Sequence, residues 1–475
     1  MKYSFFNENS TEDIIKEIET VYLNDNRPWI VGYSGGKDSS LVTQLVFEML
    51  SRLSKEKRNK KVYIISSDTL IENPIILKFL ESNIKKINQK AKEEDLPIVA
   101  KVVYPDYEDS FWTNIIGKGY PPPKSIQYRW CTERLKIKPT NKFIINKLKT
   151  EDIIVLLGVR KEESQVRKSR IEKREIDGYL LTPHDTLKNE DHAAYVYSPI
   201  VELTTDDVWE TLLNYFKMKS PWGADNGELF KLYAKGSGDG ECPFIVGEKN
   251  NNTCGNSRFG CWTCTVVSED KSLKGFIETG YTWLIPLAKL RDWLKSDEFR
   301  NNPKYRKKHR RNGSVTKRED GSYLFGPFNF EGRKLILERL LETENKINED
   351  PLYNKQCEES ISLIKEEELK EIDGIWDEEE DLTRQSMVNI YHRIKGEKLP
   401  WHDYKHPIIE KELLEELDKI IEKYEVNEEL FKRLVIEVDK NKYYINKKKS
   451  TGNIEKLLNQ QYVHEDIMDK IDDRS

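Results

Sequence analysis

The sequence predicts an α/β fold built on a mostly parallel sheet. Short runs rich in Val and Ile are the expected strands, and they occupy residues 28–33, 61–66, 97–104 and 152–159. Apolar residues recur at helical spacing between these runs, which predicts βαβ units. Ligands of such sheets bind beyond the carboxyl ends of the strands, so we expect the chemistry in the loops that follow them.

Composition divides the 475 residues into three expected domains. Residues 1–220 carry the α/β pattern. Residues 221–345 begin with loops rich in Gly, Asn and Ser, and they contain four of the six cysteines. Residues 346–475 are dominated by Glu and Lys at helical spacing, which predicts a charged helical extension.

The chain is expected to be cytoplasmic, without membrane contact. No apolar run approaches the roughly 20 residues of a membrane span, and the N-terminus lacks the order of a signal peptide. Six cysteines at irregular spacing favour free thiols, catalysis or metal binding over a disulfide framework. A net charge of -5 excludes an overall basic nucleic-acid binder but leaves room for a local basic surface.

The segment WIVGYSGGKDSS (29–40) places a glycine-rich turn between the first expected strand and a helix. Such a turn suits phosphate, because glycines let backbone amides approach an anion and the helix N-terminus attracts it. It is not a Walker A motif, since Val31 stands where that motif needs its first glycine and Asp38 follows Lys37 where it needs Ser or Thr. The alternative interpretation is a polar helix cap.

SGGKDSS resembles the S-G-G-x-D-S pyrophosphate loop (PP-loop) of the N-type ATP pyrophosphatases, which have the HUP, or adenine nucleotide alpha hydrolase-like, fold. The resemblance implies that the loop cradles the β- and γ-phosphates of ATP and that residues 1–220 are a PP-loop ATP pyrophosphatase domain. Lys37 would neutralise charge, and Asp38 would orient the loop or help to hold Mg²⁺. The implied phosphate-binding residues are Ser34, Gly35, Gly36, Lys37, Asp38, Ser39 and Ser40.

Two further segments resemble phosphoadenylylsulfate reductases. Asp68 ends the second strand in YIISSDTLIENP, which is similar to the nucleotide-contacting V-D-T-G segment; the alternative is an N-cap for the next helix. LLGVRKEESQVR resembles the G-x-R-x-x-E-S segment, which implies nucleotide contacts from Gly158, Arg160 and Arg167. Arg160 would also be catalytic, because arginine relieves charge during nucleotidyl transfer. A surface salt-bridge cluster is the alternative.

Five cysteines are candidates for one site. Cys131 lies among basic residues in QYRWCTERLKIKP, and ECPFIVGEKNNNTCGNSRFGCWTC contains four more. Only one C-x-x-C pair is present, so a two-knuckle zinc ribbon is not expected, and a cluster with one distant cysteine fits the spacing better. The basic surroundings of Cys131 favour a thiolate, either as a ligand or as a nucleophile.

The segments GYSGGKDSS, YRWCTERLKIKP, LGVRKEES, SPIVELTTDDVW and CGNSRFGCWTCTVVSEDKSLKGFI together resemble the DndC-type sulfurtransferases of bacterial DNA phosphorothioation. The likeness extends to about residue 345. It implies an ATP pyrophosphatase with a [4Fe-4S] cluster that adenylates a DNA backbone phosphate, so that sulfur replaces a non-bridging oxygen. The implied partners are DNA, a cysteine desulfurase as the sulfur donor and the other proteins of the phosphorothioation system.

The resemblance implies a cluster held by Cys131, Cys242, Cys261 and Cys264. Cluster-bearing sulfonucleotide reductases often have a Cys-Cys pair at the first position, whereas Trp130 precedes Cys131, so a ligand from the later loop is required. Cys254 either replaces Cys242 or acts as a catalytic thiol that carries sulfur as a persulfide. Buried cysteines without a cluster are the alternative.

Two other classes of function stay open. A sulfonucleotide reductase would use the same loop and would need a mobile cysteine near its C-terminus, whereas no cysteine follows Cys357. A non-catalytic iron–sulfur protein that binds DNA would tolerate the loss of Lys37 and Asp38. DNA contact is expected from residues 304–318, which contain eight Lys or Arg and no acid; the alternative is a solvated charged loop.

Overall fold

The computed structural model describes residues 4–163, 180–188, 190–236, 259–442 and 447–464. Unit 1 comprises Met1–Pro105, Trp130–Trp262 and Val267–Thr282, and unit 2 comprises Asp106–Arg129, Thr263–Val266 and Trp283–Ser475. These units cut across the three domains expected from composition, because residues 106–129 group with the C-terminal helices. Three residues of the expected site lie outside the described residues, namely Arg167, Cys242 and Cys254.

Unit 1 is built on a six-stranded sheet in the order β3-β2-β1-β4-β6-β5. All neighbours are parallel except β5, which is antiparallel to β6. The strands are β1 (Trp29–Gly32), β2 (Val62–Ser67), β3 (Ile98–Val103), β4 (Ile153–Leu156), β5 (Thr182–Lys188) and β6 (Ala193–Tyr197). This confirms the mostly parallel α/β fold. The strand order reverses between β1 and β4, and ligands of such sheets bind beside that reversal.

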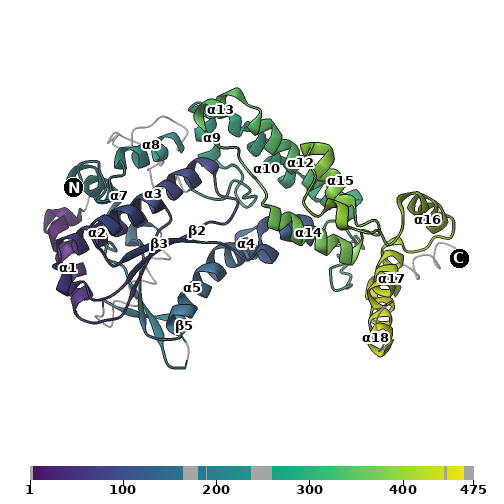
Figure 1. Ribbon diagram of the computed structural model, residues 1–475, viewed down its shortest axis with the longest axis horizontal. Helices are drawn as coiled ribbons and strands as arrows, with labels where there is room; N and C mark the ends of the chain where they lie inside the picture. The colour runs from purple at the N-terminus through teal and green to yellow at the C-terminus, as the bar shows by residue number, and fades with distance from the viewer. Residues whose placement is uncertain (1–3, 164–179, 189, 237–258, 443–446, 465–475) are drawn as a thin grey trace. The chain divides into compact units, whose positions relative to one another are not determined.

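Helices cover both faces of the sheet (Figure 1). Val31 and Ile64 point to the face covered by α1 (Thr11–Leu23), α2 (Lys37–Arg52) and α3 (Pro74–Glu93). Their neighbours Ile30 and Ile65 point to the other face, covered by α5 (Lys138–Leu148). Because both sides of each strand are buried, the strands read as continuous apolar runs rather than as alternating ones.

The β5–β6 hairpin was not expected from the sequence. β5 reads TPHDTLK and has no Val or Ile run, and its register with β6 shifts between Pro183 and Lys188. Such a strand depends on pairing with its neighbour rather than on its own propensity. The other α-helices in the described part of unit 1 are α4 (Trp130–Thr132), α7 (Thr205–Glu210), α8 (Asn226–Gly236) and α9 (Lys271–Glu278).

Unit 2 is mainly helical, which confirms the expected helical C-terminal region (Figure 1). α12 packs against α10 and α15 through buried Leu and Ile side chains. Its described residues form the α-helices α10 (Ile285–Lys295), α11 (Asp297–Arg300), α12 (Phe330–Asn348), α13 (Pro351–Gln356), α14 (Glu366–Glu379), α15 (Ser386–Lys395), α16 (Lys411–Lys423), α17 (Glu428–Asn441) and α18 (Lys447–Leu458).

Two buried tryptophans explain why residues 106–129 belong to unit 2. Trp112 Nε1 donates to the Leu363 carbonyl at 2.8 Å, and Trp376 Nε1 donates to the Ile116 carbonyl at 2.9 Å. Both indoles are fully buried, and each places its polar atom on the backbone of the other segment. The two segments therefore pack together although the bonded residues are 251 and 260 positions apart in the sequence.

Residues 306–328 form what we call the double hairpin of unit 2. Isolated bridges join Arg306 to Phe328, His309 to Val315 and Lys317 to Tyr323. The two tight turns contain Gly313 (φ +81°) and Gly321 (φ +80°), in the left-handed conformation that glycine adopts without strain. The basic segment 304–318 lies largely within this double hairpin.

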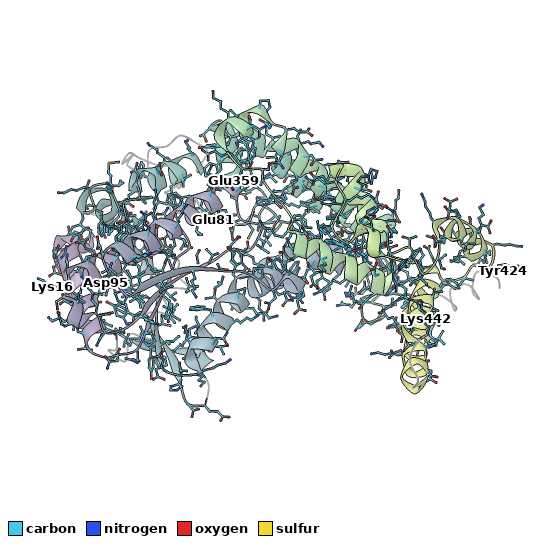
Figure 2. The ribbon with its side chains drawn as sticks, viewed as in Figure 1. Lys16, Glu81, Asp95, Glu359, Tyr424 and Lys442 are labelled. Atoms are coloured by element: carbon cyan, nitrogen blue, oxygen red, sulfur yellow. The ribbon has the colours of Figure 1, made fainter. Side chains whose placement is uncertain are left out.

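Much of the high charge content lies on the surface (Figure 2). Asp95, after α3, binds Lys55 at 2.6 Å, and Lys442, after α17, binds Asp439 at 2.7 Å. The pair of Lys55 and Asp95 is exposed on both sides, and such pairs contribute little to stability. Of the helices that the structure describes, none is both long enough and apolar enough to span a bilayer.

Candidate active site

The loop between β1 and α2 follows the carboxyl end of β1, beside the reversal in strand order. Gly35 has a φ of +72°, which favours glycine, and Gly36 is the N-cap residue of α2. Ser39 closes the turn: its Oγ accepts from the Ser34 amide at 3.1 Å and donates to the Gly36 carbonyl at 3.0 Å. The glycine-rich segment thus forms a strand–turn–helix corner, the context that phosphate binding requires.

The N-terminus of α2 presents groups that suit an anion. Among the described residues no hydrogen-bond acceptor is found for the amides of Gly35 and Gly36. Lys37 follows at the first helical position and is buried, with 6% of its surface exposed. Two amides, a lysine and the helix dipole together suit phosphate better than a simple cap does.

Asp38 joins the lysine of this loop to a buried arginine. Its Oδ2 lies 2.9 Å from Lys37 Nζ, and its Oδ1 lies 2.6 Å from Arg160 Nε. Arg160 is only 2% exposed, and its terminal nitrogens donate to Glu162 Oε2, the Leu203 carbonyl and Thr205 Oγ1. Arg160 therefore positions Asp38, and a direct contact of its guanidinium with phosphate stays a prediction.

Gly158 lets the segment after β4 approach α2. A Cβ at this position would lie 2.8 Å from the carbonyl carbon of Asp38 and 3.0 Å from the Ser39 nitrogen, closer than real Cβ atoms come to backbone. The contacts with α2 thus explain why glycine and arginine occupy these two positions of the Gly-x-Arg sequence. Gly158 permits the close approach, and Arg160 completes it by binding the Asp38 carboxylate.

Asp68 shapes the loop after β2. Its Oδ1 accepts from the Leu70 amide at 2.8 Å, and Leu70 has a φ of +66°, which is uncommon for a residue with a side chain. The N-cap of α3 is Asn73, whose Oδ1 accepts from the Ile75 amide at 3.0 Å. The alternative in which Asp68 caps this helix is therefore wrong, and its contact with a nucleotide stays a prediction.

The loop after β2 is joined to the cysteine segment. Glu72 forms an antiparallel bridge with Cys261, and the Trp262 amide donates to the Ile71 carbonyl at 3.2 Å. The sulfur of Cys261 lies 3.4 Å from Thr69 Oγ1 and 3.8 Å from Glu72 Oε1. A loop expected to contact nucleotide and a cysteine expected to handle sulfur or iron are thus neighbours within unit 1.

Lys136 lies at the same place. Its Nζ is 3.1 Å from Glu72 Oε1, and the charges of the Cys261 thiolate and of Glu72 raise the pKa of Lys136. Burial raises the pKa of Cys261 to about 12, an effect that Lys136 opposes. The charge of Cys131 also acts on both groups, with the smallest of the effects on each pKa. One of the expected cluster ligands, Cys261, thus shares its surroundings with a cation.

The four-cysteine ligand set stays a prediction. Within the residues that the structure describes, no group of three or more His, Cys, Asp and Glu side chains lies close enough to hold a metal ion. Cys264 belongs to unit 2, where its carbonyl accepts from Arg291 Nε at 2.8 Å. Cys261 fits a cluster in one respect, since Lys136 opposes the burial effect that keeps this residue a neutral thiol.

Four residues of the basic segment 304–318 bind carbonyl or carboxylate groups within unit 2. Arg306 is buried and donates from Nε to the Gly326 carbonyl at 2.9 Å; burial lowers its pKa to about 10. Lys307 binds Glu380 at 2.7 Å and Glu429 at 2.8 Å. His309 and Arg311 also bind carboxylates, of Glu429 and Glu379.

The other five cations of the segment are exposed. Lys308 and Lys317 both lie over the ring of Tyr323, at 5.2 and 5.0 Å from its centroid. The exposed set is Lys304, Lys308, Arg310, Lys317 and Arg318. A run of eight positive residues therefore offers five exposed positions to an external anion, and the other three are engaged in buried or ionic contacts.

Sequence reasoning missed one residue of the loop's surroundings. The Lys37 amide donates to the hydroxyl of Tyr233, on α8, at 3.1 Å. Tyr233 lies in the unremarkable stretch KLYAKG, almost two hundred residues after the loop. No local pattern marks it, because only the fold brings α8 to the N-terminus of α2.

The family model of the phosphoadenosine phosphosulfate reductase domain matches residues 28–267, which is half of the chain. A curated relative, an uncharacterized protein of Methanocaldococcus jannaschii, is 26% identical over 249 residues. That alignment covers 51% of this chain and 42% of the relative, so the chain spans less than half of that protein's length.

Two solved structures that resemble the chain do so with low sequence identity and low TM-scores. The FMN adenylyltransferase of Candida glabrata is 13% identical, covers 51% of this chain and 67% of its own, and has a TM-score of 0.28. The U34-tRNA thiolase NcsA of Methanococcus maripaludis, solved with its [4Fe-4S] cluster, is 16% identical, covers 62% and 84%, and has a TM-score of 0.31. At these scores the likeness carries no conclusion about activity.

Proposed function

Because this chain belongs to the phosphoadenosine phosphosulfate reductase domain family, we propose that it is an ATP-dependent sulfurtransferase that places sulfur in the DNA backbone. The observation that carries the proposal is the corner between β1 and α2. There, two glycine residues, the N-terminus of α2 and buried Lys37 occur together at the sheet's ligand-binding edge.

The loop holds the β- and γ-phosphates of ATP and leaves the α-phosphorus open to attack. A non-bridging oxygen of a DNA phosphodiester attacks that phosphorus, and the bond to pyrophosphate breaks. The attack joins two anions, so it needs positive charge. Lys37 supplies some of it and Mg²⁺ the rest, while Asp38 keeps Lys37 at the loop or contributes to the Mg²⁺ site.

Adenylation makes the attacking oxygen of the DNA phosphate, a poor leaving group by itself, part of AMP, which leaves more easily. The terminal sulfur of a persulfide then forms a bond to the DNA phosphorus as the bond to AMP breaks. A second thiol cleaves the remaining S–S bond, becoming part of a disulfide and leaving sulfur on phosphorus. The persulfide sulfur comes from a cysteine desulfurase, and Cys254 is the proposed carrier in this chain.

Four other cysteines are proposed to bind an iron–sulfur cluster. Cys131, Cys242, Cys261 and Cys264 would hold a [4Fe-4S] cluster, which would supply an iron site at which sulfur can be bound. Thr69 and Glu72 lie beside Cys261, so the loop after β2 contributes to the surroundings of this thiol. That proximity supports placing sulfur chemistry near the nucleotide-binding loops of unit 1.

Nucleotide chemistry is tested with purified protein. Anaerobically purified chain is incubated with ATP, Mg²⁺ and duplex DNA, and the phosphate products are separated. We expect pyrophosphate from the natural chain and none from Lys37→Ala, and we expect AMP only when a persulfide donor is added, because sulfur displaces AMP from the adenylated DNA. Release of orthophosphate would contradict adenylation, and sulfite formed from phosphoadenylylsulfate would identify a reductase instead.

Sulfur transfer is tested in cells. DNA from cells with the natural chain, with Lys37→Ala and with no chain is digested by nuclease and analysed by mass spectrometry. We expect sulfur-bearing dinucleotides only with the natural chain and its partner proteins. Sulfur found in tRNA and not in DNA would keep the chemistry but replace the substrate.

A further inference from the structure

Tyr233 lies against two residues of the phosphate-binding corner. Its hydroxyl oxygen accepts the hydrogen bond of the Lys37 amide at 3.1 Å. A Cβ on Gly36 would lie 3.1 Å from the same oxygen, tighter than most Cβ contacts. The first amide of α2, a group that binds phosphate in glycine-rich corners, therefore has a phenol as its partner.

The phenol keeps a proton that it can donate. Burial raises the pKa of Tyr233, and the nearby Asp38 carboxylate acts in the same direction, so the hydroxyl is neutral at physiological pH. A neutral phenol that accepts one bond still has one O–H to give. Among the residues that the structure describes, no acceptor for this proton is found.

The ring of Tyr233 is held from two sides. Trp209 meets it edge to face at 5.3 Å between centroids, and Phe259 lies at 4.6 Å. Tyr233 has 8% of its surface exposed, so swinging the ring aside would break packing on both sides. When an anion reaches the N-terminus of α2, the hydroxyl is therefore expected to stay and to donate rather than to leave.

We propose that Tyr233 is a phosphate-binding residue of this site, whose O–H donates to an oxygen of the nucleotide's diphosphate while its oxygen keeps the Lys37 amide. This inference rests on the proposed function, because it assumes that the corner binds the β- and γ-phosphates. It assigns to α8 a part of the site that no loop motif contains. Phe259 extends the contact toward Cys261, two residues further along the chain.

The direct probe is inorganic pyrophosphate with Mg²⁺, titrated calorimetrically into the full chain. A hydrogen bond to a charged acceptor corresponds to a change of about ten- to a hundredfold in affinity. We therefore expect Tyr233→Phe, which keeps the ring, to weaken pyrophosphate binding at least tenfold. AMP lacks the two outer phosphates, so its affinity should stay unchanged.

Tyr22→Phe is the matched control. Tyr22 is also buried in unit 1, and its hydroxyl donates to the Lys60 carbonyl at 3.1 Å, away from the corner. The control removes one buried tyrosine hydroxyl in the same way and should leave pyrophosphate affinity unchanged. If both variants weaken pyrophosphate binding alike, the effect is a general loss of stability and the proposal is wrong.

A second measurement combines Gly36→Ala with Tyr233→Phe in a double-mutant cycle. The added methyl group presses on the hydroxyl, so Gly36→Ala should weaken pyrophosphate binding, and less so when Phe replaces Tyr233. In steady-state assays Tyr233→Phe should raise KM for ATP with little change in kcat, as expected for uniform binding.

The two levels of the proposal fail in different ways. If the natural chain binds pyrophosphate and Tyr233→Phe binds it equally well, the role of Tyr233 is overturned and the phosphate-binding loop stands. If the natural chain binds neither pyrophosphate nor ATP, the proposed function falls, and the role of Tyr233 falls with it.

Discussion

Two stretches of the chain look suited to anions from sequence, and they differ in what the fold does with them. The corner at residues 34–40 has a single lysine, yet glycine conformations, a helix N-terminus and Asp38 organise it around one position. The basic segment 304–318 has eight cations, and three of them, Arg306, Lys307 and Arg311, are spent on contacts within unit 2.

The comparison teaches that a run of charged residues indicates an anion-binding site less well than glycines that fix the backbone of a turn. A lysine or arginine in sequence does not reveal whether an acid from a distant helix has already paired with it. Glycines at a strand–helix corner, by contrast, fix backbone amides whose direction follows from the turn itself. The predictions below test two ideas. Phosphate binding in unit 1 should depend on the geometry of the corner, and DNA binding in unit 2 should depend on which cations are exposed.

The largest effect is expected at Asp38. Asp38→Ala removes the shared partner of Lys37 and of the buried Arg160, and leaving a buried charge unpaired costs about 3–5 kcal/mol. We expect at least a thousandfold loss of pyrophosphate release, together with a lower melting temperature. Lys55→Ala is the control, because Lys55 belongs to the exposed pair with Asp95 and its loss should be undetectable in both assays.

Gly158→Ala comes next. The new Cβ would meet the backbone of Asp38 at 2.8 Å, so the first turn of α2 must shift and the corner loses its geometry. We expect about a hundredfold loss of activity, since small displacements of positioned groups have effects of that size. Gly374→Ala is the control, because a Cβ there meets nothing within 4 Å. Equal activity of the two variants would contradict the close-approach explanation.

The sequence predicted the parts of unit 1 that repeat a local rule. β1 to β4 follow from Val and Ile runs, and the corner follows from SGGKDSS, because both depend on residues adjacent in the chain. The β5–β6 hairpin, Tyr233 and the role of Gly158 could not be predicted, since each depends on a neighbour distant in sequence. The ion pairs of Lys307 could not be predicted either, because its partners Glu380 and Glu429 lie on or beside helices of the C-terminal region.

The exposed cations of the double hairpin provide the third test. Replacing Lys308, Arg310, Lys317 and Arg318 by Gln should weaken binding to duplex DNA about tenfold and make its salt dependence shallower. For every phosphate that the protein no longer neutralises, the slope of log affinity against log salt concentration becomes shallower by roughly 0.9. The measurement is fluorescence anisotropy at several salt concentrations, with melting temperature as the check on folding.

Lys307→Gln is the contrasting variant for that test. Lys307 already binds two carboxylates, so its loss should lower the melting temperature and leave the salt slope unchanged. If Lys307→Gln flattens the slope as much as the exposed set does, pairing within unit 2 does not withhold a cation from DNA. The comparison between the two regions would then lose its basis.

The smallest effect is expected at Glu429, which holds the double hairpin to α17. Burial alone would raise the pKa of Glu429, but Lys307 and His309 outweigh it and lower the pKa below the usual 4.5. A carboxylate with a lowered pKa stabilises the fold above its unfolded-state pKa, and this contribution is lost as pH falls below about 4.5.

Glu429→Gln should therefore cost about 1–3 kcal/mol at pH 7 and progressively less in acid. Denaturant unfolding of both proteins, followed from pH 7 to pH 3, measures the difference. The two stability curves should converge as the pH falls, because below about 4.5 the unfolded natural chain binds a proton at Glu429 whereas the folded chain, with its lowered pKa, does not. Parallel curves would mean that the Glu429 carboxylate contributes no charge-dependent stability, and that Lys307 and His309 hold the hairpin without it.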